Sequence, residues 1–111
     1  MWLLDANLDI HLNELLRAFG VECDTAENRG WKALRNGDLV AAAVAAGFDT
    51  LLTRDLLFAE SASRAWRLFP EFSVVVVTLP QLPSRPYLEA FASLWAISPI
   101  RPQPGRLVVW P

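Results

Sequence analysis

The sequence contains a single cysteine, Cys23, among its 111 residues. One cysteine cannot form an intramolecular disulfide or a cluster of thiolate metal ligands. Histidine is equally scarce, because His11 has no second histidine or cysteine at ligand spacing, and we expect it on a helix surface. Metal sites built from cysteine and histidine are therefore excluded.

The chain also lacks a net positive charge and a long apolar run. Its 10 basic and 12 acidic residues give a formal net charge of −2, so no global electrostatic attraction to nucleic acid is expected. All the basic residues except Lys32 are arginine, which leaves a local arginine patch for phosphate open. No apolar run reaches the roughly 18 residues of a membrane span, and no signal peptide is visible. We therefore expect a cytoplasmic protein without membrane contact.

Apolar and aromatic side chains, in contrast, are in excess. Hydrophobic residues make up 53% of the sequence, and five tryptophans are among them. The excess is consistent with a surface that binds a partner protein or a second copy in a homodimer, with candidate surfaces around Trp31, Trp66 and Trp95. An aromatic-rich core explains it equally well. The sequence leaves both interpretations open.

Strand-like and helix-like segments alternate along the chain. Strands are expected at 2–5, 21–25, 48–53, 73–79 and 106–110. Helices are expected at 8–20, 38–47, 56–69 and 87–96, with Gly20 and Gly47 at helix ends.

This alternation predicts a single α/β domain over residues 1–111. Parallel strands need crossover connections, and the crossovers become helices on both faces of the sheet. The run 73–79 lacks alternation, as expected of a strand covered on both faces. Residues 99–111, a Pro-rich stretch followed by an edge strand or arm, extend the same domain. The prediction is a three-layer α/β/α fold with a central, mostly parallel sheet.

Three aspartates are expected to meet at one edge of that sheet. Asp5 ends the first strand, Asp55 follows the third, and Asp38 is expected to open a helix as its N-cap. Ligands of open parallel sheets bind beyond the carboxyl ends of the strands, where the helices also begin. Asn7 and Thr53 would add neutral oxygens beside the acids.

Such a cluster of carboxylates needs compensation. Two unit charges ~4 Å apart repel by about 4 kcal/mol at an effective dielectric constant of ~20. A divalent cation, a shared proton or pairing with Arg54 would relieve the repulsion, and an oxygen-only ligand set suits Mg²⁺ or Mn²⁺. Asp9 and Asp24 are expected to be solvated and to lie outside the cluster.

Helix capping is a simpler explanation of the same residues. A capping Asp or Asn contributes ~1 kcal/mol, which by itself would account for Asp38, for Asn7 before the first helix and for Asp55 after the third strand. Thr53 is at home in a strand. A cap and a metal ligand are compatible, because helix N-termini and strand C-termini share one edge of the sheet.

Three motifs in this order resemble the PIN-like family of toxin ribonucleases, relatives of the PIN domain and of VapC-type toxins. The motifs are W-L-L-D-A-N-L at 2–8, N-G-D-L-V-A-A-A at 36–43 and L-L-T-R-D-L-L-F at 51–58. The resemblance covers roughly residues 1 to 80. It implies a three-layer α/β/α PIN-like fold and a metal-dependent endoribonuclease.

The resemblance also implies roles for individual residues. The catalytic and metal-binding acids of the family match Asp5, Asp38 and Asp55. Its supporting positions match Asn7, Thr53 and Arg54, where the arginine would steady Asp55 or touch phosphate. A water activated by Mg²⁺ or Mn²⁺ would cleave RNA phosphodiester bonds. A cognate antitoxin protein is the implied partner.

Two departures from the family pattern favour an alternative function. Ala6 stands where the family usually has Glu, and Leu57 stands where it often has a further acid, although Phe58 is retained. The alternative is a catalytically degenerate PIN-like module that binds a partner protein without cleaving RNA. A phosphate-receiver domain fits less well, because it needs a lysine on a late strand and Lys32 lies in an expected loop.

Overall fold

The structure, a computed structural model, describes the backbone of residues 1–111 and the side chains of all of them except residues 36, 62 and 63. Five strands and four α-helices follow one another along the described backbone. The strands are β1 (Trp2–Leu4), β2 (Cys23–Thr25), β3 (Thr50–Thr53), β4 (Ser73–Val77) and β5 (Leu107–Trp110). The helices are α1 (Leu12–Ala18), α2 (Asn36–Ala45), α3 (Leu56–Ser63) and α4 (Ser84–Ile97), with a 3-10 turn, η1 (Arg64–Arg67), directly after α3.

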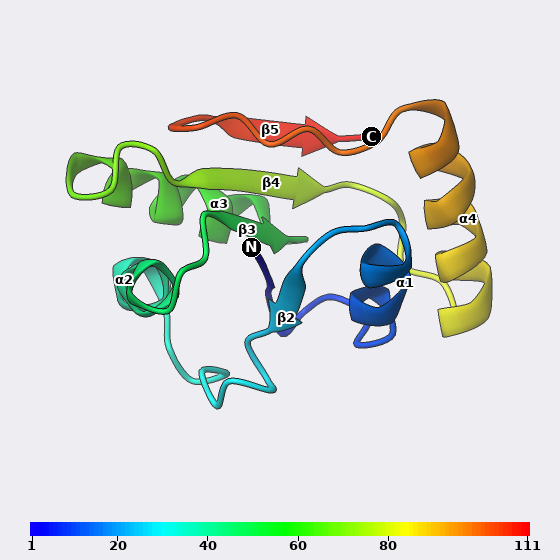
Figure 1. Ribbon diagram of the computed structural model, residues 1–111, viewed down its shortest axis with the longest axis horizontal. Helices are drawn as coiled ribbons and strands as arrows, with labels where there is room; N and C mark the ends of the chain where they lie inside the picture. Colours follow the sequence, from blue (N-terminus) through cyan, green and yellow to red (C-terminus); the bar gives the residue numbers. More distant parts are fainter.

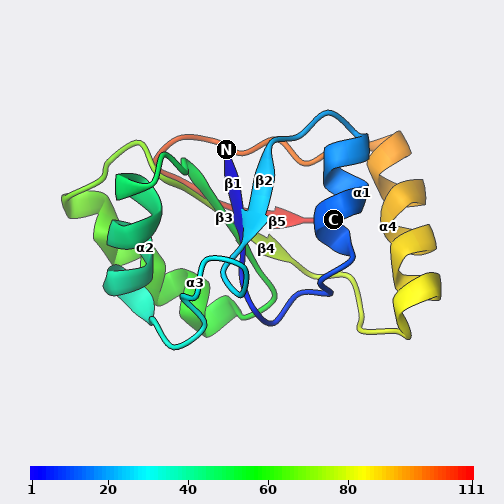
Figure 2. The ribbon, with the colours of Figure 1, turned by 60° about the horizontal axis from the view of Figure 1, so that its bottom comes forward.

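The strands form one sheet in the order β2-β1-β3-β4-β5. All four pairings between the described strands are parallel. Helices α1 and α4 cover one face of the sheet, and α2 and α3 cover the other (Figure 1 and Figure 2). The predicted three-layer α/β/α fold is confirmed, and the sheet is parallel throughout rather than mostly parallel.

Neighbouring residues of each strand point to opposite faces, and this alternation divides the core in two. Leu4 and Leu52 belong to the cluster beneath α1 and α4, whereas Leu3 and Leu51 belong to the cluster beneath α2 and α3. All four side chains are at most 1% exposed. Both faces are covered by helices, which explains why the strands lack an apolar-polar alternation.

The tryptophans contribute to this core. The ring of Trp95 lies within 6.5 Å of four other aromatic rings, those of Trp2, Phe19, Phe91 and Trp110. The indole N–H of Trp66 donates to the carbonyl of Phe72 at 2.6 Å. All five tryptophan side chains are buried or half-buried. The structure therefore supports the aromatic-rich core as the explanation of the aromatic excess.

The first helix begins later than predicted. Helix α1 starts at Leu12, with His11 in the N-cap position, and not near residue 8. Asp9 Oδ1 accepts a 2.9 Å hydrogen bond from the backbone N–H of His11, which fixes the turn before the helix. Leu8 is buried in that turn, so it matches the helical spacing without being helical. The predictions of a helix from residue 8 and of a cap at Asn7 are therefore wrong.

Helix α2 begins earlier than predicted, and Asp38 is not its N-cap. Arg35 takes that position, and the N–H of Asp38 donates to the Arg35 carbonyl at 3.1 Å. Asp38 lies in the first turn instead, where a negative charge interacts favourably with the helix dipole. Gly47, with φ of 92°, follows the C-cap residue Ala46 as predicted.

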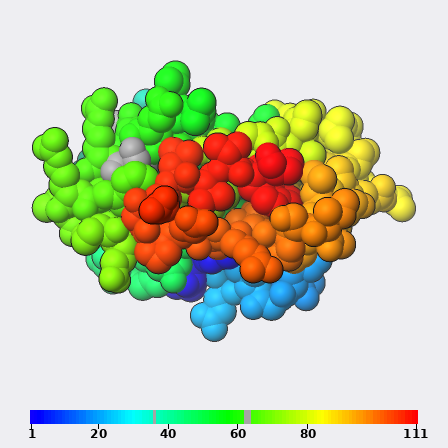
Figure 3. All heavy atoms as spheres, turned by 90° about the horizontal axis from the view of Figure 1, so that it is seen from above, coloured from blue at the N-terminus to red at the C-terminus, as the bar shows by residue number. Residues whose placement is uncertain are grey.

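Helix α4 and the C-terminal segment complete the sheet. Pro86 lies in the first turn of α4, where its missing N–H has no helical partner to lose, so the helix starts before the predicted residue 87. Strand β5 pairs with β4 at the sheet edge. Seen from above, the orange and red C-terminal segment lies across the molecule between the green and yellow regions (Figure 3). No helix in the described part of the chain is long and apolar enough to span a membrane.

Candidate functional site

The carboxyl ends of β1 and β3 form the centre of the candidate site. These strands are neighbours, and the chain leaves β1 toward β2 on one side and β3 toward β4 on the other. Such a point of reversal is where open parallel sheets bind ligands. Asp5 directly follows β1, Thr53 is the last residue of β3, and Asp55 lies just beyond it.

The hydroxyl of Thr53 joins the residues of this edge. It donates to Asp5 Oδ2 at 2.8 Å and accepts from the side-chain amide of Asn7 and from the backbone N–H of Asp55, both at 3.2 Å. Thr53 itself is fully buried. A buried hydroxyl with three partners fixes their relative positions. The predicted grouping of Asn7 and Thr53 with Asp5 and Asp55 matches this geometry.

Asp5 and Asp55 line one hollow of about 420 Å³, which we call the acidic hollow. Asp55 Oδ1 also accepts a hydrogen bond from the N–H of Phe58 at 3.1 Å, so it caps α3 as the alternative interpretation predicted. The carboxylate therefore contributes to both the helix and the hollow. Capping does not exhaust its acceptor capacity, because an ionised carboxylate offers about four lone-pair sites.

Lys32 and Arg35 line the same acidic hollow and were missed as site residues by sequence reasoning. They lie in the connection from β2 to α2, which has no clear periodicity. A usable signal existed, because every strand-to-helix connection of a parallel sheet lies at the carboxyl edge. As cations on the same hollow, they offer contacts for an anion.

Asp38 does not line the acidic hollow. It borders a neighbouring hollow between α2 and α3, together with Arg64 and the apolar Leu68 and Phe69. The structure thus brings together two of the three predicted acids, and Asp38 lies apart from them. Its place on α2 follows from the earlier start of that helix.

The donor set of the acidic hollow restricts the kind of cation it can hold. Among the side chains that the structure describes, no three His, Cys, Asp or Glu residues are grouped closely enough to bind a metal ion. Asp5 and Asp55 form a pair with unused lone pairs. Mg²⁺ is commonly held by one or two carboxylates, with water and substrate phosphate completing its coordination. The two carboxylates can hold such a cation when a substrate phosphate completes its coordination. They are too few to coordinate the ion without water or substrate.

The two departures from the family pattern lie beside this pair. The backbone N–H of Ala6 donates to Asp5 Oδ1 at 2.7 Å, a contact that does not depend on the side chain at position 6. Leu57 lines the acidic hollow and is 75% exposed. An exposed apolar side chain at that position supplies no ligand, but it offers a contact surface.

Arg54 points away from Asp55. Its Nη1 donates to Gln81 Oε1 at 2.7 Å, and its backbone N–H donates to Asn7 Oδ1 at 3.3 Å. No ion pair joins Arg54 to Asp55 among the described side chains. Arg54 borders a second, smaller hollow on the α1/α4 side of the edge.

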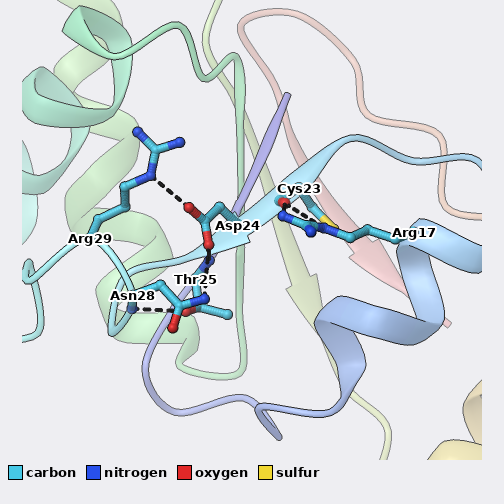
Figure 4. A network of polar contacts seen from close by, with 6 residues as sticks. All are labelled: Arg17, Cys23, Asp24, Thr25, Asn28 and Arg29. Carbon is cyan, nitrogen blue, oxygen red and sulfur yellow. Dashed lines mark hydrogen bonds and ion pairs between the residues drawn. The ribbon is translucent and has the colours of Figure 1, made fainter.

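Asp24, which we expected to be solvated, takes part in an ion pair beside β2 (Figure 4). Its side chain is 17% exposed, its Oδ2 accepts from Arg29 Nε at 2.6 Å, and its Oδ1 accepts from Thr25 and Asn28. Burial alone would raise the pKa of Asp24, but these hydrogen bonds and the Arg29 charge hold it below the ordinary value. The network stabilises the turn after β2.

Cys23, next to this network, is a structural residue. The thiol is buried, and its backbone carbonyl accepts two hydrogen bonds from Arg17 (Figure 4). Burial raises the pKa of the thiol, which keeps it protonated and unreactive at neutral pH. Cys23 therefore packs as a core residue.

A comparison of the chain with protein-family models, curated proteins and solved structures gave no match. The chemistry of the edge therefore follows from its own side chains. These are the Asp5 carboxylate held by the Thr53 hydroxyl, the Asp55 carboxylate held by the Phe58 N–H, two cations on the same hollow and a second polar hollow.

Proposed function

We propose that the chain is a Mg²⁺- or Mn²⁺-dependent endoribonuclease of the toxin type, with the PIN-like architecture that its three motifs resemble. One observation carries the proposal: Asp5 and Asp55 line a single hollow at the point of strand reversal, and both hydrogen-bond to Thr53. The two carboxylates and the cations around them are the groups that phosphodiester cleavage uses.

Each residue has a distinct task in this proposal. Asp5 and Asp55 hold the divalent cation, and the Thr53 hydroxyl keeps the Asp5 carboxylate oriented toward it. Lys32 and Arg35 bind the RNA backbone by charge and hydrogen bonding. The bound cation supplies a water of lowered pKa and neutralises charge that develops on the phosphodiester.

Calorimetric titration of Mn²⁺ into the wild type and into Asp5→Asn tests the site. Binding to the wild type that is lost in Asp5→Asn, followed by metal-dependent cleavage of RNA, is the expected result. If free Mn²⁺ binds too weakly to detect, the titration is repeated with a non-hydrolysable RNA present, because the phosphate completes the coordination. Absence of binding under both conditions would refute the metal site.

Asp38→Asn is a second informative variant for the Mn²⁺ titration. The geometry of the described side chains leads us to expect that it retains Mn²⁺ binding, since Asp38 borders a different hollow. Loss of binding in Asp38→Asn would instead restore the three-carboxylate site that the family resemblance implies.

A second candidate function is supported by exposed apolar side chains within α3 and just after η1. Leu57 is 75% exposed on the acidic hollow, and Leu68 is 78% exposed after α3. A degenerate PIN-like module would use such a surface to bind an antitoxin-like protein or a second copy of the chain without cleaving RNA. Static light scattering of the wild type and of Leu57→Ser with Leu68→Ser tests self-association. A monomer at every concentration would remove the homodimer from this candidate.

A further inference from the structure

The second hollow of the carboxyl edge has a volume of about 240 Å³ and is not used by the proposed metal chemistry. Its lining comes from the connections after β1, β3 and β4 and from the first turns of α4, and it includes Asn7, Asp9, Arg54, Gln81, Leu82 and Tyr87. We call it the Tyr87 hollow. It is smaller than the roughly 300–1,000 Å³ typical of drug-sized ligands, so it suits one small group.

The hydroxyl of Tyr87 is the unexplained group in this hollow. Tyr87 is 2% exposed, and its hydroxyl has no hydrogen-bond partner among the described residues. Buried hydroxyls are almost always paired, so an unpaired one points to a bound water or a ligand. Burial raises the pKa of Tyr87, so the hydroxyl keeps its proton and can donate a hydrogen bond.

Asp9 supplies an ionised acceptor on the same wall. Its side chain is only 20% exposed, contrary to the expectation that it is solvated. Burial alone would raise the pKa of Asp9, but hydrogen bonds from the His11 backbone and from the Ser84 and His11 side chains hold it below the ordinary value. The carboxylate is therefore charged at neutral pH.

Arg54 and Gln81 supply donors in the same hollow. Arg54 Nη1 donates to Gln81 Oε1, which leaves the amide nitrogen of Gln81 as a further donor. The guanidinium keeps further N–H groups, because arginine has five. One carboxylate and one guanidinium give the hollow no net charge, so it favours neither a phosphate nor a metal cation. A neutral ligand with donors and acceptors on one edge fits best.

We infer that the Tyr87 hollow binds a guanine base. Guanine alone among the RNA bases presents two adjacent N–H donors for a carboxylate beside a carbonyl oxygen for an arginine. Asp9 would accept from the two donors, and Arg54 and the Tyr87 hydroxyl would each donate to a lone pair of the carbonyl oxygen, where adenine has an amino group instead. Leu82 offers an apolar surface for the face of the base.

The Thr53 hydroxyl links a lining residue of each hollow, which makes RNA the ligand that would place a base there. Asn7 lines the Tyr87 hollow and Asp5 lines the acidic hollow, and both hydrogen-bond to the Thr53 hydroxyl. We therefore expect an RNA whose phosphate lies over the acidic hollow to place a nearby base in the Tyr87 hollow. This inference rests on the proposed function for the identity of the ligand as RNA, but not for the metal or for cleavage.

The test measures binding of two short, fluorescein-labelled RNAs in EDTA, one with a single guanine and one with adenine in its place. Fluorescence anisotropy should show that wild type binds the guanine RNA about tenfold more tightly, the size expected of one bidentate base contact. Tyr87→Phe should lose most of this preference while its melting temperature stays equal or rises, because the lost hydroxyl had no partner. Asp9→Asn should lose the preference, and Asp49→Asn, at the opposite edge of the sheet, should keep it.

Equal binding of the two RNAs by wild type, or an unchanged preference in Tyr87→Phe, would overturn the guanine site. This binding test is independent of the proposed metal site and of RNA cleavage, because EDTA removes divalent cations from the solution. Guanine preference that persists in Asp5→Asn supports the site even if no nuclease activity is found. Mn²⁺ binding and RNA cleavage without a guanine preference would overturn the site and leave the nuclease intact.

Discussion

The hydroxyl of Thr53 donates a 2.8 Å hydrogen bond to Oδ2 of Asp5, a residue 48 positions earlier in the chain. The bond joins the ends of two neighbouring parallel strands. It therefore links the stability of the fold to the orientation of a candidate metal ligand. A substitution at Thr53 is expected to affect both.

Thr53→Val should lower the free energy of unfolding by about 2–3 kcal/mol. The substitution keeps the shape and leaves Asp5, the Asn7 amide and the Asp55 N–H without their shared partner. Urea denaturation followed by circular dichroism measures the change. Thr53→Ser, which keeps the hydroxyl, is the control and should lose less. Equal stability of Thr53→Val and wild type would show that the hydroxyl has no structural role.

Asp55→Ala and Asp55→Asn should separate the cap from the metal ligand. Ala removes the acceptor for the Phe58 N–H and should cost about 1 kcal/mol, whereas Asn is an equally good N-cap and should cost little. Asn also removes a charge beside Asp5, which favours the metal-free protein. Thermal melts in chelator give the stabilities, and calorimetry should show weakened Mn²⁺ binding in both variants. Stability losses of equal size would argue against the cap.

Acid should destabilise the fold partly through Asp24. Its pKa in the folded chain is lowered from the ordinary 3.8, so its contribution to stability is fully present above that value. The contribution is lost as the pH falls through the lower pKa of the folded state. Urea midpoints measured from neutral pH to below 3.8 should fall less steeply for Asp24→Asn than for wild type. Glu27→Gln, at an exposed position in the same connection, should keep the wild-type slope.

Leu57→Asp should strengthen metal binding if Asp5 and Asp55 hold the cation. Leu57 lines the acidic hollow and is largely exposed, so a carboxylate there is not penalised by burial. A third oxygen ligand should lower the Kd for Mn²⁺ by about tenfold or more. Leu57→Asn, which adds polarity without charge, is the matched control and should bind much less tightly. An unchanged Kd for Leu57→Asp would place the cation elsewhere.

The α/β architecture could be predicted from the sequence because helices and strands follow from short local patterns. Glycines at helix ends, apolar strands and their alternation with helices predict a parallel sheet. The order β2-β1-β3-β4-β5 was not predicted, because it depends on which strands pair across the sheet. The helix starts were predicted less well. Leu8 lies at helical spacing although it belongs to a buried turn before α1. Asp38 matches the pattern of an N-cap although Arg35 occupies that position.

The site was predicted only in part, because side-chain placement depends on residues distant in sequence. Asp5, Thr53 and Asp55 could be grouped from the positions of strand ends alone. Helix α2 begins before Asp38, and Asp38 borders another hollow, which no local pattern of the sequence indicates. The hydrogen bond between Arg54 and Gln81, which are 27 positions apart, could not be predicted from the sequence either.

The burial of the lone thiol makes the molecule a convenient host for site-directed labelling. Cys23 is inaccessible in the folded chain, and no other native cysteine competes for a maleimide reagent. A cysteine introduced at the exposed position of Leu57 would accept a dye or spin label without prior removal of Cys23. Movements at the mouth of the acidic hollow could then be followed spectroscopically in an otherwise unaltered chain.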